Sequence, residues 1–228
     1  MAGLEKKDIC VLIPAFNEEK NIGPLMARLR AFGADTLVID DGSTDRTAEE
    51  ARRSGAEVLR FERNGGKGAS LRRGFDWFLG RSYKAAVMMD ADGQHDPDEL
   101  GIFLAALNEG RGGLIVGNRM GSPGEMPFSR RAVNRLMSLA LSVLTRQGIP
   151  DSQCGYRAIL REALEKINLR ADRFETESEI LLEASRLGYK IFSVPVRSVY
   201  RGGPSNIRPF RDTLRFFRFL AVYSLNRL

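Results

Sequence analysis

Short apolar runs alternate with amphipathic stretches along most of the chain, and this alternation constrains the fold more than any other feature. The first run, residues 9–13, is followed by a helical pattern at 21–32. Further strands are predicted at residues 37–39, 58–61, 85–89, 114–116, 153–160 and 190–196. Further helices are predicted from Thr44 or Asp45 to 54, and at 69–79, 132–145, 174–187 and 209–228. Together they indicate one α/β domain with a mostly parallel sheet flanked by helices.

Polar clusters follow three of the predicted strands. They occupy residues 14–18, 40–45 and 90–96, each directly after an apolar run. Ligands of such sheets bind beyond the carboxyl ends of the strands. We therefore expect the three clusters to converge on one edge of the sheet. A loop rich in Gly, Pro and Arg is predicted at residues 117–131, and its part between residues 121 and 131 could close over a substrate.

The acidic segment after the fourth predicted strand carries the clearest chemical signal. It contains Asp90, Asp92 and Gln94 at alternate positions. Two carboxylates and an amide oxygen suit a hard divalent cation, Mg²⁺ or Mn²⁺, whose remaining ligands would be phosphate oxygens. The alternative is a solvated acidic turn. A P-loop is excluded because residues 65–69 lack its spacing, and no Gly-x-Gly-x-x-Gly dinucleotide motif follows the first strand.

The net charge of +6 favours a polyanionic partner: nucleic acid, an anionic membrane surface or a phosphorylated substrate. The basic residues are dispersed and form no nucleic-acid recognition motif, so no nucleic-acid partner is expected. The chain has only two cysteines, Cys10 and Cys154, and its first residues resemble no secretory signal, which favours a cytoplasmic location. No apolar run approaches the roughly 20 residues that span a bilayer.

Five motifs in one order together resemble the inverting family 2 glycosyltransferases with a GT-A fold, and among them the dolichyl- and polyprenyl-phosphate sugar synthases. The motifs lie at residues 11–19, 38–47, 64–70, 90–97 and 153–157. The resemblance spans about residues 9–207. We therefore expect a Rossmann-like GT-A domain at residues 1–207 and a basic amphipathic C-terminal helix at residues 208–228.

The resemblance also implies roles for individual residues. Asp90, Asp92 and Gln94 would bind the metal and the pyrophosphate. On chemical grounds we expect Asp92 to be the key metal ligand and a catalytic residue. Arg119, Arg131 and Arg201 would hold the donor and acceptor phosphates. The residues expected to bind the nucleotide sugar are Pro14, Phe16, Glu18, Ile39, Asp41, Lys67, Asp90, Ala91 and Arg201. One departure is Asn206, where the family more often has lysine.

The expected reaction moves a sugar from a GDP-mannose or UDP-glucose type of donor to polyprenyl or dolichyl phosphate, with inversion. A phosphate acceptor is already largely ionised near neutral pH, because its second pKa is about 6. It therefore needs positioning by arginines more than a base. A soluble or glycan hydroxyl acceptor is the alternative, and it would need a base such as Glu175 or Glu177. A catalytically silent nucleotide-sugar-binding protein is the other alternative.

Two more features bear on the site and its surroundings. His95, the single histidine, follows the acidic segment and either takes part in the chemistry or orients that loop. The helices predicted at 132–145 and 209–228 are basic and amphipathic, which indicates either a membrane surface or packing on the domain or on a second subunit. We expect a peripheral position at the cytoplasmic membrane face, with a membrane-anchor partner or a homo-oligomer left open.

Overall fold

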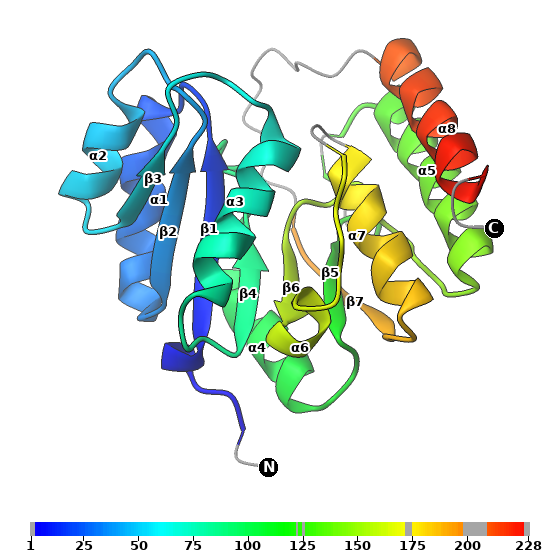
Figure 1. Cartoon of the computed structure of the whole chain (residues 1–228), viewed down its shortest axis with the longest axis horizontal. Helices are drawn as coiled ribbons and strands as arrows, with labels where there is room; N and C mark the ends of the chain where they lie inside the picture. The colour runs from blue at the N-terminus through cyan, green and yellow to red at the C-terminus, as the bar shows by residue number, and fades with distance from the viewer. Residues whose placement is uncertain (1–2, 122, 125, 172–174, 198–208, 226–228) are drawn as a thin grey trace.

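The computed structural model describes residues 3–121, 123–124, 126–171, 175–197 and 209–225. Within them, seven strands form one sheet in the order β3-β2-β1-β4-β6-β5-β7 (Figure 1). The strands are β1 (Ile9–Ala15), β2 (Asp35–Asp40), β3 (Glu57–Arg60), β4 (Ala85–Met88), β5 (Leu114–Asn118), β6 (Arg157–Leu160) and β7 (Ile191–Pro195). All neighbouring strands are parallel except β6, which is antiparallel to both β4 and β5. The predicted, mostly parallel α/β sheet is confirmed.

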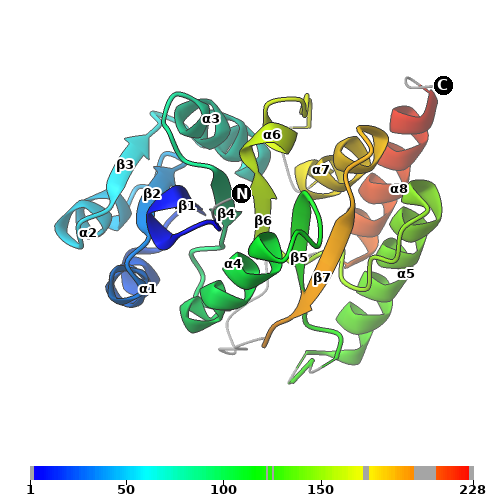
Figure 2. The same cartoon turned by 90° about the horizontal axis from the view of Figure 1, so that it is seen from below.

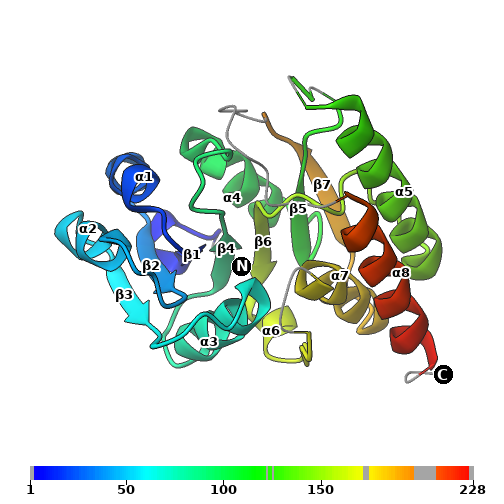
Figure 3. The same cartoon turned by 90° about the horizontal axis from the view of Figure 1, so that it is seen from above.

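Helices cover both faces of this sheet. They are α1 (Glu19–Phe32), α2 (Thr47–Arg53), α3 (Lys67–Leu79), α4 (Leu100–Asn108), α5 (Phe128–Thr145), α6 (Arg161–Leu164), α7 (Glu175–Arg186) and α8 (Pro209–Leu225). Helices α1 and α4 lie on one face, and α3, α6 and α7 on the other (Figures 2 and 3). Because the sheet is covered twice, its central strands are continuous apolar runs, and every residue of β4 is buried.

Three helices differ from the sequence-based expectation, and one of them, the four-residue α6, was not assigned. Helix α4 was not assigned, although its buried residues Leu100, Phe103 and Leu107 have helical spacing. Helix α5 begins at Phe128, after Pro127, so Arg130 and Arg131 lie in its first turn and not in the predicted loop at 117–131. Proline has a fixed φ that suits the start of a helix, and that signal was available in the sequence.

Helices α5 and α8 lie side by side beyond α7, at the β7 end of the sheet (Figures 1 and 3). Phe216 and Leu220 of α8 are buried in the main hydrophobic core, and the Tyr223 hydroxyl donates a 2.6 Å hydrogen bond to the Glu183 carboxylate of α7. One face of the C-terminal helix therefore packs on the domain. Within the described part of the chain, no helix is both long enough and apolar enough to span a bilayer.

Candidate active site

The polar segments that follow β1, β2 and β4 meet at one edge of the sheet, as the sequence predicted. Ala15 is paired with Asp40, and the backbone N–H of Asp41 donates a 2.9 Å hydrogen bond to Ala15. Strand β6 runs in the opposite direction and pairs Arg157 with Met88. Its amino end, with the 153–157 motif, therefore reaches the same edge as the carboxyl end of β4.

Asn17 links the loop after β1 to the loop after β2 by hydrogen bonds. Its side-chain Oδ1 accepts a 2.9 Å hydrogen bond from the backbone N–H of Thr44, and its own N–H donates to the hydroxyl of Ser43 at 2.9 Å. The φ of Asn17 is +57°, in the left-handed region that asparagine tolerates better than most residues. The sequence analysis did not single out Asn17, and an asparagine directly after a strand was the available signal.

Asp41 holds the glycine-rich loop that precedes α3. Its two carboxylate oxygens accept hydrogen bonds from the backbone N–H groups of Gly65 and Gly66, at 2.9 and 2.8 Å. Neighbouring Gly42 has a φ of +76°, and a β-carbon there would lie 2.8 Å from the Arg63 carbonyl carbon. Asp41, predicted to contact the nucleotide, is thus buried beneath the loop that places Lys67.

Lys67 brings two carboxylates together across the site. Its ammonium group, at the first residue of α3, forms ion pairs with Asp90 after β4 and with Glu177 in the first turn of α7. Burial alone would raise the pKa of Asp90, but the charge of Lys67 overrides it and holds that pKa far below its usual range. Asp90 therefore carries a full negative charge at neutral pH.

Asp92 has a different environment from Asp90. Its Oδ1 accepts a 2.9 Å hydrogen bond from the backbone N–H of Gln94. Burial, and then the negative charge of Asp90, raise the pKa of Asp92 to about 6. A divalent cation would offset this repulsion. The side-chain oxygens of Asp90, Asp92 and Gln94 are therefore chemically suited to bind a divalent cation. Among the described residues, no three acidic, histidine or cysteine side chains are grouped as a complete metal site, so other oxygens would have to complete the shell.

His95 orients the acidic loop. Its Nδ1 accepts a hydrogen bond from the backbone N–H of Asp90 at 3.2 Å, and its ring stacks on Tyr156 with 5.3 Å between centroids. The side chain is almost completely buried, and burial lowers the pKa of His95 to about 4. The imidazole is therefore neutral at pH 7. The orienting role, which the sequence analysis left open, is the one that this geometry supports.

The 153–157 motif packs directly against Asp90. A β-carbon built at Gly155 would lie 2.5 Å from Oδ2 of Asp90, so only glycine leaves room for this carboxylate. Arg157 is fully buried, and its guanidinium donates to the backbone oxygens of Cys154 and Ser152, at 2.8 and 2.7 Å, and of Glu177. The sequence analysis missed the specific roles of Gly155 and Arg157.

The three predicted phosphate-binding arginines have different positions. Arg119, in the segment after β5, is buried and forms a bidentate ion pair with Asp151, at 2.8 and 3.0 Å, while its charge also helps to lower the pKa of Asp90. Arg131 donates to the backbone oxygen of Met126 at 3.3 Å, and its Nε is buried with no hydrogen-bond partner among the described residues. Arg201 lies outside the described residues.

The remaining residues predicted to bind the nucleotide sugar lie either at the rim of the site or in the hydrophobic core. Phe16 is exposed, and Pro14 and Glu18 are half-buried, at the end of β1; burial raises the pKa of Glu18. In contrast, Ile39 is fully buried against Gly74 of α3, and Ala91 is 3% exposed in the core. The structure therefore does not bring the side chains of Ile39 and Ala91 to the surface of the site.

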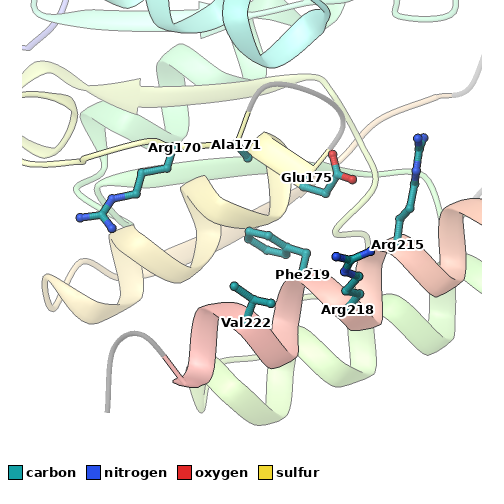
Figure 4. Close-up of a pocket in the computed structure, with 7 residues that line it drawn as sticks. All are labelled: Arg170, Ala171, Glu175, Arg215, Arg218, Phe219 and Val222. Carbon is teal, nitrogen blue, oxygen red and sulfur yellow. The ribbon is translucent and has the colours of Figure 1, made fainter.

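A separate pocket of about 430 Å³ lies between α7 and α8 (Figure 4). Its lining combines apolar side chains of α8 with charged side chains of both helices. The lining residues are Arg170, Ala171, Glu175, Arg215, Arg218, Phe219 and Val222. None of the predicted donor or metal residues is among them.

Known proteins resemble this chain in sequence. The sequence model described as "Glycosyl transferase family 2" matches residues 10–168. The chain is 34% identical to polyprenol monophosphomannose synthase of Mycolicibacterium smegmatis, over 82% of this chain and 75% of that protein. It is 31% identical to UDP-N-acetylglucosamine--dolichyl-phosphate N-acetylglucosaminyltransferase of Methanococcus voltae, over 85% of this chain and 86% of that protein.

The fold also matches a solved structure. Glucosyl-3-phosphoglycerate synthase from Mycobacterium tuberculosis, in complex with Mn²⁺, UDP and phosphoglyceric acid, superposes with a TM-score of 0.73 and 24% identity. The match covers 96% of this chain and 78% of that one. At this identity the likeness shows the GT-A fold, which confirms the predicted architecture.

Proposed function

The chain belongs to glycosyl transferase family 2, and from this premise we propose that it transfers a sugar, with inversion, from a nucleoside diphosphate sugar to polyprenyl or dolichyl phosphate. The observation that carries the proposal is the pair of carboxylates, Asp90 and Asp92, beside a lysine at the edge of a GT-A sheet. One relative over 30% identical is named as a polyprenol monophosphomannose synthase, and another as a dolichyl-phosphate N-acetylglucosaminyltransferase.

The site residues have separate proposed roles. Asp92 and Gln94, with Asp90, would hold Mg²⁺ or Mn²⁺, which when bound offsets the negative charge that grows on the leaving diphosphate. The charge of Arg119 helps to lower the pKa of Asp90, and Arg131, in the first turn of α5, has a buried Nε with no hydrogen-bond partner among the described residues. Arg131 and Arg201 would hold the acceptor phosphate, which is already ionised and attacks without a general base.

The donor is proposed as a nucleotide sugar of the GDP-mannose or UDP-glucose type. The relatives' names support a nucleotide-sugar donor but differ in the sugar, since one is named for mannose and another for N-acetylglucosamine. Phe16 is exposed beside Pro14 and Glu18 at the end of β1 and would meet the nucleobase. Residues 1–207 would form the catalytic domain, and residues 208–228 its C-terminal helix.

A sugar-transfer assay tests this proposal. Purified protein is incubated with polyprenyl phosphate and each of a panel of UDP- and GDP-sugars, with Mn²⁺ or Mg²⁺ and again with EDTA. We expect a lipid-linked sugar from one donor class, and we expect EDTA to abolish it. Product with a soluble sugar acceptor and none with the lipid would instead establish the hydroxyl-acceptor activity. Donor binding without any product would indicate a silent binding protein.

We further propose that helices α5 and α8 bring the enzyme to the cytoplasmic face of a membrane. Leu136, Leu139 and Val143 form an exposed apolar stripe along α5, with 48%, 62% and 68% of their surfaces accessible. Leu214 and Leu225 are similarly exposed on α8, on the side opposite its buried residues. The basic net charge favours anionic lipid.

Replacing Leu139 and Val143 together with glutamate should weaken binding to vesicles of phosphatidylcholine and phosphatidylglycerol by at least about tenfold. Each buried apolar side chain contributes about 1.5–3 kcal/mol, and each added carboxylate repels anionic lipid. Vesicle co-sedimentation measures the effect. Ile102→Glu, at a 39% exposed position on α4, is the matched control and should bind normally. Unchanged vesicle binding by the double variant would contradict the proposal. If light scattering showed that the double variant had lost a dimer that the wild type forms, the apolar stripe on α5 would instead be a contact with a second copy of the chain.

A further inference from the structure

A cluster of partly buried charges, with 28% of the Asp90 side chain exposed, joins three elements that are far apart in the sequence. Lys67 begins α3, Asp90 follows β4, and Glu177 lies 110 residues after Lys67 in the first turn of α7. The Lys67 and Glu177 side chains are only 19% and 11% exposed. Ion pairs at such depth are sensitive to the loss of one member, because the remaining charge is left without compensation.

Glu177 is held from a second side by Arg157. Nη2 of Arg157 lies 3.9 Å from Oε2 of Glu177, and Nη1 donates to the backbone oxygen of the same residue. Lys67 binds Oε1 of Glu177. Each carboxylate oxygen of Glu177 therefore faces a cation of the protein. The guanidinium of Arg157 is itself held in place by the backbone oxygens of Cys154 and Ser152.

Lys67 is in turn the cation that faces Asp90. It binds Oδ1 of Asp90, while the other side of this carboxylate abuts Gly155. Without the Glu177 carboxylate, the Lys67 ammonium has lost one of the two anions that place it. The position of Asp90, and with it the charge that acts on Asp92, depends on this chain of contacts.

From these contacts we infer that Glu177 is a positioning residue for donor binding: it fixes Lys67, and through Lys67 it sets Asp90. It is not the base that accepts a proton from the acceptor. This inference rests on the proposed function, since it assigns Glu177 within the same donor site. It also explains why a carboxylate is placed at the start of α7 in an enzyme whose phosphate acceptor has no proton to remove.

Nucleotide affinity tests the inference without any turnover. Isothermal titration of UDP and of GDP, each with Mn²⁺, is compared for the wild type, Glu177→Gln, Lys67→Met and the double variant. Loss of an outer partner of a metal site typically costs about 10–100-fold in affinity, so each single variant should bind about tenfold or more weakly. The double variant should lose much less than the product of the single losses, because both act through one ion pair. Glu109→Gln, which removes an exposed ion pair with Arg111, is the matched control.

The kinetic readout separates positioning from proton transfer. For Glu177→Gln we expect a raised KM for the donor, and a pH profile of kcat with the same limbs as the wild type. Glu177→Asp, which keeps the charge, should recover part of the affinity. Unchanged nucleotide affinity, with a large fall in kcat and a lost limb of the pH profile, would overturn the inference and make Glu177 the base. Multiplicative losses in the double variant would also overturn it.

Failure of this inference is distinguishable from failure of the proposed function. If the wild type binds neither UDP nor GDP with Mn²⁺, the proposed donor is wrong. If the wild type binds and Glu177→Gln binds equally well, only the positioning role is wrong. Thermal unfolding of each variant checks that a loss of affinity reflects the site, and the conservative Glu177→Asp provides a second measurement if Glu177→Gln fails to fold.

Discussion

Replacing Asp92 with alanine is expected to abolish sugar transfer, with a fall in kcat/KM of at least about 10³-fold. A divalent cation contributes several kcal/mol to the stabilisation of charge on a leaving diphosphate, and about 1.4 kcal/mol corresponds to a factor of ten in rate. Of the two proposed carboxylate ligands, Asp92 is the less engaged by the protein, since its described hydrogen bond is to the backbone N–H of Gln94, whereas Asp90 is paired with Lys67. Transfer assays with metal-stripped protein and titrated Mn²⁺ measure the effect.

The same substitution should leave the fold intact at neutral pH. The pKa of Asp92 is raised from 3.8 to about 6 in the folded protein, so its ionisation destabilises the folded state as the pH rises through this interval. Removing the carboxylate should therefore not lower the melting temperature at pH 7.5. Asp98→Ala, at an exposed position in the same region, is the control and should keep full activity. Wild-type transfer by Asp92→Ala in stripped protein would refute the metal assignment.

The sequence predicted the parts of the site that depend on local order along the chain. Each polar cluster directly follows an apolar strand, and parallel strands end at the same edge of the sheet. The positions of Asp90, Asp92 and Lys67 at that edge follow from this rule. Helix α4 was equally predictable from the spacing of Leu100, Phe103 and Leu107, and was overlooked.

Two other features depend on contacts between distant segments, which no local pattern encodes. The direction of β6 is one, because the short apolar segment Ala158–Leu160 pairs equally well in either direction. Its antiparallel direction alone brings Gly155 and Arg157 to the site. The pairing of Lys67 with Glu177 is the other, since it spans 110 residues. Without that contact, the sequence could offer Glu177 only as a candidate base for a hydroxyl acceptor or as an ordinary charged residue at a helix start.

Transferring whole motifs from a family has a further limit. Successive side chains of a strand point to opposite faces, so a motif that runs along a strand includes residues that face the core. Ile39 lies in β2 with no exposed surface, and Ala91 is buried after β4. Any contact of these two positions with a donor would have to be through the backbone. The motif as a whole predicts the family, but the role of each residue within it can be assigned only from the folded structure.

Gly155→Ala is expected to reduce kcat/KM by about 100-fold, although it adds a single methyl group. The new β-carbon would lie 2.5 Å from Oδ2 of Asp90 and 2.9 Å from both Cγ and Oδ1, so the whole carboxylate must move. A displacement of about 1 Å at a reacting centre can cost about 10²-fold in rate. Asp90 cannot retreat without weakening its ion pair with Lys67. Transfer kinetics and UDP titration should therefore both show the loss.

Gly148→Ala separates this steric effect from the general cost of replacing a glycine. A β-carbon at Gly148 meets nothing within 4 Å, and neither Gly148 nor Gly155 has a positive φ, so alanine is compatible with both backbones. We expect Gly148→Ala to keep wild-type kinetics and stability. If Gly155→Ala were as active as the wild type, Asp90 would be free to move during the reaction. The carboxylate would then not need the fixed position that Lys67 and Gly155 give it.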